Sequence, residues 1–240
     1  MIGIYQYFAI GLFATFALLE RFGSGRTLPA VRHWRIKGAA FLLLYLAIST
    51  YLPTLTDAWL GRFRLIPADT FPFWLQVGGG FLVAEFGVYA WHRTMHNTPL
   101  LWRWFHQMHH SAERVDIWGA VYFHPFDSLG FTFVGSLALV LVFGVSGEAA
   151  VIINLAATFL ALVQHANIRT PQWLGYLIQR PESHNFHHER GVHGRNYGDL
   201  PLFDLIFGTF HNPREFKGEC GFYDGGSKRV SEMLVGRLIA

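Results

Sequence analysis

The residues whose number and spacing indicate chemistry in this chain are its histidines. The 240-residue sequence contains 13 of them, and only His33 precedes residue 92. Eight form three boxes with the spacings H-x3-H, H-x2-H-H and H-x2-H-H: His92, His96, His106, His109, His110, His184, His187 and His188. Residues at i, i+3 and i+4 share one face of a helix. Each box is therefore expected to present its imidazoles together.

Imidazole is the commonest metal-ligating side chain, which gives these boxes a direct chemical meaning. Two further candidates, His124 and His165, lie between the boxes. One four-coordinate zinc ion needs only three or four protein ligands, so eight to ten histidines predict a site for two metal ions. Imidazole suits iron, zinc and copper, and the spacing leaves the metal open. The isolated His33, His193 and His211 are interpreted as structural.

The elements that must position the boxes are predicted to be membrane helices. Apolar residues make up 52% of the chain and charged residues 15%, against about 25% charged in soluble domains. A membrane-spanning helix needs about 20 apolar residues. Five stretches have that length and carry few charges or none: residues 1–19, 38–56, 70–91, 128–147 and 149–168. We predict an all-α, polytopic helical bundle of four or five membrane segments, forming one domain over residues 1–240.

The basic residues predict an orientation for this bundle. Residues 21–37, 92–127 and 169–240 hold 17 of the 19 Lys and Arg residues. Because cytoplasmic loops are enriched in these residues, the N-terminus is expected outside and the boxes and C-terminus inside. A cytoplasmic helical cap, 92–127 and 169–240, would then carry the two metals. The basic charge indicates topology and attraction to lipid headgroups, so no nucleic-acid partner is expected.

Four smaller features bear on the predicted fold and site. The single cysteine, Cys220, excludes an intramolecular disulfide framework, a Cys-ligated zinc site and an iron–sulfur cluster. The first segment lacks the basic start of a cleaved signal peptide. Glu85 lies inside an apolar stretch, where a carboxylate is either functional or paired with a neighbouring donor. The amphipathic run Val230–Ile239 fits either an interfacial helix or a structural cap.

The three boxes resemble those of the fatty acid hydroxylase/sterol desaturase superfamily, whose members are integral-membrane, non-haem di-iron oxygenases. Asn196-Tyr197-Gly198, followed by Asp204 and by Phe207 to Phe210, is similar to the closing signature of that family. Phe203 departs from the tryptophan of many members at a packing position. The resemblance implies as metal ligands, with His124 the least certain, His92, His96, His106, His109, His110, His124, His165, His184, His187 and His188.

The resemblance also implies an activity. Such enzymes use dioxygen and two electrons to hydroxylate or desaturate a C–H bond of a lipid, such as a fatty acyl chain, a sterol or an ether lipid. The cofactor would be two iron ions, with zinc an option in isolated protein. The chain has no nucleotide-binding loop or fused haem domain, so a separate electron donor is expected, a reductase with a ferredoxin or a small haem cytochrome. Candidate acids for orienting the imidazoles are Glu113, Asp116, Glu182, Glu189 and Asp199.

Other classes of protein explain the pattern less well. A metalloprotease of the H-E-x-x-H type needs a glutamate where this chain has Arg93. A bis-histidine haem protein needs a few histidines on facing helices within the bilayer rather than dense boxes. The remaining alternative is a membrane metal-binding or transport protein without oxygenase activity, although transporters place their sites near the midplane. Metal content combined with dioxygen consumption separates these classes.

Overall fold

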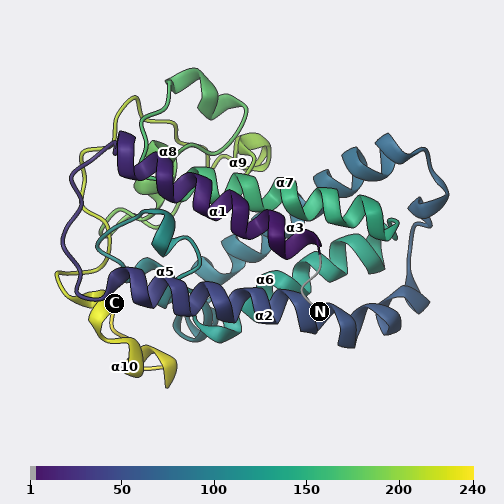
Figure 1. Cartoon of the computed structure of the whole chain (residues 1–240), viewed down its shortest axis with the longest axis horizontal. Coiled ribbons are helices and arrows are strands. Elements are labelled where there is room, and N and C mark those ends of the chain that lie inside the picture. Colours follow the sequence, from purple (N-terminus) through teal and green to yellow (C-terminus); the bar gives the residue numbers. More distant parts are fainter. Residues whose placement is uncertain (1–3) are drawn as a thin grey trace.

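The computed structural model of the protein describes residues 4–240, and Figure 1 shows a helical molecule. The described residues contain no strand, only one isolated bridge between Glu189 and Cys220. The all-α prediction is confirmed for them. The first three residues of the predicted 1–19 segment lie outside the described part. The helices are α1 (Ile4–Gly23), α2 (Trp34–Leu60), α3 (Phe73–Asn97), α4 (Pro99–Leu101), α5 (Gln107–His110), α6 (Pro125–Ser136), α7 (Gly147–His165), α8 (Pro181–His187), α9 (Pro201–Phe207) and α10 (Val230–Leu234).

The five long helices run side by side as an elongated bundle, and the short helices and long loops gather at one end of it (Figure 1). Four of the five apolar stretches recognised in the sequence lie largely within one of these helices, and the fifth, 128–147, is shared by α6 and the π-helical turn that continues it. The predicted hairpin is present: α6 continues as a π-helical turn, Leu137–Val142, and α7 returns after a short connection. The oxygen of Ser146 accepts a hydrogen bond from the Ala149 N–H and so caps α7.

Within residues 4–240, three helical stretches are long and apolar enough to cross a membrane: Trp34–Phe63, Pro125–Val142 and Gly147–His165. α2 exposes the large apolar side chains of Leu43 and Leu55. Exposed apolar side chains on a helix of this length are what a membrane-facing surface would carry. The number of crossings and the side on which the histidine-bearing end lies stay predictions.

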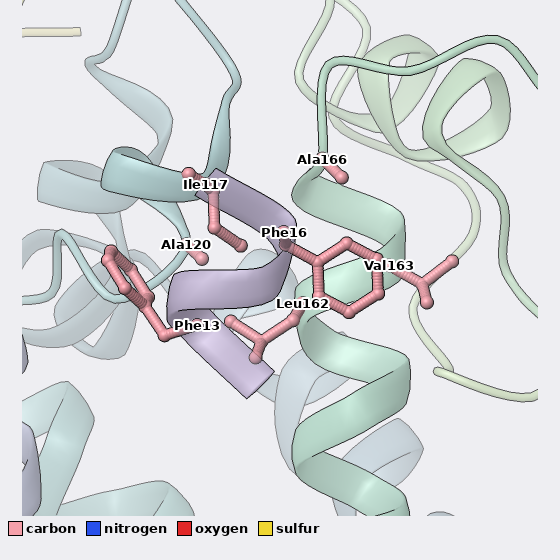
Figure 2. Packing of buried hydrophobic residues seen from close by; sticks show 7 residues of the cluster. All are labelled: Phe13, Phe16, Ile117, Ala120, Leu162, Val163 and Ala166. Carbon is pink, nitrogen blue, oxygen red and sulfur yellow. The ribbon is translucent and has the colours of Figure 1, made fainter. Parts of the chain in front are cut away.

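The packing of α1 against α7 fixes the end of the bundle that carries histidines (Figure 2). Phe13 and Phe16 lie three residues apart and therefore on one face of α1. They pack against Leu162 and Val163 of α7, together with Ile117, Ala120 and Ala166. His165, the last residue of α7, follows this packed turn directly. Burial of the apolar cluster thus sets the position of a candidate metal ligand.

The C-terminal segment covers the second histidine box. The helix α10 is only five residues long, and Met233 and Ile239 are buried beside Met108. The Gln107 side chain donates to the carbonyl of Arg237 at 2.8 Å and accepts from the N–H of Ile239 at 3.2 Å. Of the two interpretations open for this segment, the structural cap is therefore the one that the fold supports.

Candidate metal centre

Nine of the ten candidate histidines come together in two adjacent clusters. In each cluster one ring nitrogen per residue lies within 4.8 Å of the corresponding atoms of the others. The first cluster consists of His92, His96, His106, His110 and His187. The second cluster consists of His109, His165, His184 and His188. All of these side chains are buried except that of His96, which is half-buried.

The clusters do not correspond to the boxes. In the second box His106 and His110, four residues apart, belong to the first cluster, and His109 belongs to the second. The third box does the reverse: its i, i+4 pair belongs to the second cluster and its middle histidine, His187, to the first. Box members are thus neighbours, as their spacing predicts, yet each of these two boxes contributes to both clusters and ties them together.

The third box is positioned by a fixed helix start. Pro181 occupies the first turn of α8, where its missing N–H costs nothing. The preceding Arg180 is fully buried, and its guanidinium donates to the Asn212 side chain at 2.7 Å and to the Thr170 carbonyl at 2.9 Å. It also forms an ion pair with Glu182 at 3.0 Å. These contacts anchor the helix from which three imidazoles project.

The spacing of the ring nitrogens suits metal ions. Imidazole nitrogens bind zinc at about 2.0–2.1 Å, so ligands of one ion lie roughly 3 Å apart. Neighbouring Nε2 atoms lie 2.9–3.1 Å apart in the pairs His92–His106, His92–His187, His109–His165, His165–His184 and His184–His188. The donor set therefore fits two ions, one in each cluster.

Unpartnered atoms and protonation state agree with this fit. Burial lowers the pKa of His109, His110 and His184 well below the usual value, and neighbouring histidines lower it further. These imidazoles are neutral at physiological pH, which is the form that binds metal. Within the described residues, Nε2 of His96 and of His110 is buried without a hydrogen-bond partner. Buried polar atoms of this kind normally have an ion or water beside them.

Two backbone carbonyls of one loop orient imidazoles of the first cluster. Nδ1 of His92 donates to the carbonyl of Tyr197 at 2.7 Å, and Nδ1 of His187 donates to that of Arg195 at 2.6 Å. A hydrogen bond from Nδ1 fixes the tautomer in which Nε2 is free to bind metal. The loop thus holds two candidate ligands from different helices.

The signature residues noticed in the sequence hold that loop in place. Asp204 accepts from the N–H groups of Tyr197 and Gly198 at 2.9 and 2.8 Å, and from the Thr209 hydroxyl at 2.6 Å. Asn196 adopts a left-handed backbone (φ 59°) and its side chain bonds to two further backbone carbonyls. A Cβ at position 198 would lie 2.6 Å from a backbone oxygen, so only glycine fits there.

The acid that contacts an imidazole is one the sequence analysis missed. Asp127 is fully buried on α6, and its Oδ2 lies 2.7 Å from Nδ1 of His106. The only sequence signal for it is its position three residues after His124. None of the five predicted acids hydrogen-bonds to a histidine ring in the described chain. Four of them bind other groups, with Glu113 on Ser227, Asp116 on Trp34, Glu182 on Thr170 and Asp199 on Gln164.

The remaining histidines differ in their distance from the clusters. His124 lies outside both, and its Nδ1 accepts from the N–H of Phe126, which caps α6. His193 was interpreted as structural, but its Nδ1 lies 3.1 Å from Nδ1 of His110, beside the first cluster. His33 precedes α2, and the ring of His211 packs on Phe186. Spacing alone did not distinguish His193 from the other two.

A cavity of about 160 Å³ extends from both clusters into the bundle. His92 and His106 of the first cluster line it together with three members of the second. Much of the remaining wall is apolar and comes from α3, α6, α7 and the segment before α6, including Val88, Phe123, Phe131, Ile153 and Leu162. An apolar ligand in this cavity would therefore lie beside both clusters.

Comparison with known proteins agrees with this centre. The model of the fatty acid hydroxylase family matches residues 77–209, more than half of the chain, and the chain belongs to this family. The match includes all ten candidate histidines and the signature up to Thr209. No solved structure matches the chain.

The relatives include an ornithine lipid hydroxylase of Rhizobium tropici, 35% identical over 60% of this chain and 44% of the relative. Sphinganine C4-monooxygenase 1 of Arabidopsis thaliana is 28% identical over 54% of this chain and 51% of its own length. A very-long-chain aldehyde decarbonylase of Oryza sativa is 30% identical over 55% of this chain and 54% of its own length. The chain spans about half the length of these relatives.

Proposed function

We propose that this protein is a membrane-bound di-iron oxygenase that hydroxylates a C–H bond of a lipid. The observation that carries the proposal is the pair of buried histidine clusters opening onto one largely apolar cavity. Family membership supports it, as do relatives named as lipid hydroxylases and a monooxygenase. The balanced reaction takes the lipid, dioxygen, two electrons and two protons to the hydroxylated lipid and water.

The nine clustered histidines would hold the two metal ions, and His124 would not. Iron bound there supplies the oxidising power that an unactivated C–H bond requires. A donor set made only of imidazole nitrogens binds zinc as well as iron, so the ligands alone do not identify the metal, and iron is proposed here. The task of the protein is to fix the ligands: the carbonyl of Tyr197 and the carboxylate of Asp127 turn Nε2 of His92 and His106 toward the centre.

The cavity wall binds and orients the lipid. Phe123 and Phe131 stack with ring centroids 5.7 Å apart beside the imidazoles, and Phe123 also contacts His109. Burying a hydrocarbon segment against these rings is favourable and excludes water from the reacting carbon. The C–H bonds of neighbouring carbons in a lipid chain are similar in strength. The position of hydroxylation is therefore set by which carbon the cavity wall holds closest to the clusters.

Electrons would enter from the opposite side of the first cluster. An open cleft of about 700 Å³ is lined by His96, Trp102, His193 and Tyr197. The Trp102 ring contacts His96 and His110, with centroids 5.0 and 5.2 Å apart. In the proposed orientation this cleft faces the cytoplasm, where a reductase with a ferredoxin or a small haem cytochrome would deliver electrons.

The first test is metal stoichiometry in detergent-purified protein, followed by a screen of lipids for dioxygen-dependent products. We expect about two iron atoms per chain and a hydroxylated lipid. His109→Ala and His187→Ala remove one ligand from the second and the first cluster, respectively, and should lower both readouts. Protein that folds normally but contains no metal, with variants indistinguishable from it, would refute the proposal.

A further inference from the structure

The cavity beside the clusters has one wall that is not apolar. Glu85 on α3 lines it, and the side chain is only 1% exposed. Glu85 and His92 are seven residues apart, which is two helical turns or about 10 Å, so they share a face of α3. A group held at Glu85 therefore lies in the same cavity as the first cluster and within about two helical turns of it.

One oxygen of Glu85 lacks a partner. Oε2 accepts a hydrogen bond from the N–H of Leu200 at 3.2 Å, which holds the carboxyl group in place. Oε1 is buried and has no hydrogen-bond partner among the described residues. Asp199 stands on the same wall, but Gln164 already donates to its Oδ1 at 2.6 Å. Glu85 thus retains a buried acceptor without a partner among the described residues.

Two hydroxyl groups that also line the cavity are paired with each other. The hydroxyl groups of Tyr5 and Thr158 bond to each other at 2.9 Å. A purely hydrocarbon ligand would leave Oε1 of Glu85 desolvated and unpaired, which is unfavourable. A ligand with an O–H or N–H group at this point would satisfy the oxygen and gain affinity and orientation.

We propose that Glu85 accepts a hydrogen bond from a hydroxyl or amide N–H of the lipid, on the part of the molecule that lies in the cavity. The substrate is then a lipid that carries such a donor within about two helical turns of the clusters, rather than a plain hydrocarbon chain. Glu85 determines specificity and fixes which carbon faces the clusters. This inference rests on the proposed oxygenase function.

The test compares three probes of equal chain length: 3-hydroxyhexadecanoic acid methyl ester, N-methylhexadecanamide and hexadecanoic acid methyl ester. Binding to the iron-loaded protein is measured by native mass spectrometry, and turnover by product analysis. We expect the two donor-bearing probes to bind roughly tenfold or more tightly than the plain ester. Glu85→Leu should remove this preference. Thr158→Val, in the same cavity but at a paired hydroxyl, should keep it.

The outcomes separate this inference from the proposed function. Equal binding of all three probes to the wild-type protein overturns the role of Glu85, whether or not a lipid is hydroxylated. A Glu85-dependent preference without turnover of any lipid refutes the oxygenase while leaving the binding role in place. If melting temperature and iron content show that Glu85→Leu is misfolded, Glu85→Met replaces it, because methionine is similar in length and lacks the oxygen acceptor. The preference should then be lost, and an unchanged preference would contradict the proposal.

Discussion

The two histidine clusters lie side by side but are supported differently. In the first cluster, Nδ1 of His92, His106 and His187 each has an oxygen acceptor at 2.6–2.7 Å. In the second cluster His165 has one, the carbonyl of Ala161 one turn earlier in α7. Nδ1 of the other three members is buried and has no partner in the described part of the chain: His109, His184 and His188.

This difference indicates a division of roles. Outer hydrogen bonds orient ligands before metal arrives and raise their basicity, so the first cluster is the more preorganised one. The second cluster depends more on the bound ion to order its imidazoles. We expect the first site to bind metal more tightly and the second to lose its ion first.

The largest effect is expected when a metal ligand is removed, and two adjacent histidines allow each cluster to be tested separately. His187 belongs to the first cluster and His188 to the second. His187→Ala and His188→Ala should each reduce the iron content from about two atoms per chain to about one. Each should also lower the rate of hydroxylation by more than about 100-fold, a larger effect than the loss of a residue that only hydrogen-bonds to a metal ligand. Elemental analysis and product formation measure both. Loss of both irons in either variant would show that the clusters do not bind independently.

The next effect tests the support of the first cluster. Asp127→Ala removes the acceptor from His106 and should weaken metal binding at the first cluster by about 10–100-fold. Asp127→Asn keeps an acceptor oxygen without the charge and should cost less. Glu148→Gln is the control, because Glu148 is exposed in the first turn of α7, at the opposite end of that helix from His165.

Competitive metal titration of the single-metal variant His188→Ala reads the first site alone. The comparison between clusters is wrong if Asp127→Ala in that background binds metal as tightly as its parent. It is also wrong if the control weakens binding to the same degree.

The helices and the grouping of histidines were predictable, because both depend on local patterns. Apolar runs of about 20 residues predict helices by length. Four of the five runs fall largely within one helix, and the fifth falls within α6 and its π-helical continuation. The H-x3-H and H-x2-H-H spacings predict shared faces, and nine of ten candidates lie together. His124 differs because its ring caps α6 instead, a role that the His-Pro pair at a helix start does not reveal.

The division into two clusters was not predictable from the sequence. It depends on how α3, α5, α7 and α8 cross, and spacing within a box carries no information about that crossing. Asp127 and His193 were missed for the same reason, since each approaches its partner only through tertiary packing. The short α10 shows a further limit: an amphipathic run of ten residues becomes five helical residues plus an extended cap, because Ile239 is buried in the core.

A third prediction uses pH to separate the clusters. Burial lowers the pKa of His184 and His188 well below the unfolded value of about 6.5, so the unfolded chain binds more protons near that pH. Their stabilising contribution is full above about pH 6.5 and is lost as pH falls. For each histidine that stays neutral in the folded state, the free energy of unfolding of the metal-free protein should fall by about 0.7 kcal/mol between pH 7 and pH 6.

Acidification also displaces metal, since protons compete for the same nitrogens. His187→Ala retains only the second site and His188→Ala only the first, so each variant reports one cluster. We expect His187→Ala to release its ion at the higher pH, measured by a colorimetric chelator during titration. Release at the same pH from both variants would contradict the proposed difference in preorganisation.

The smallest effect concerns the loop that supports the first cluster. The Thr209 hydroxyl donates to Asp204, which holds the backbone of Tyr197 and thereby the acceptor for His92. Thr209→Val should lower stability by about 1 kcal/mol and weaken metal binding at the first site by a few-fold, leaving the second site unchanged. Thr94→Val on the exposed face of α3 is the matched control. The effect is expected to be small because the substitution only shifts the position of one carbonyl. Equal weakening of metal binding at both sites would mean that the loop acts through the general stability of the fold rather than through His92.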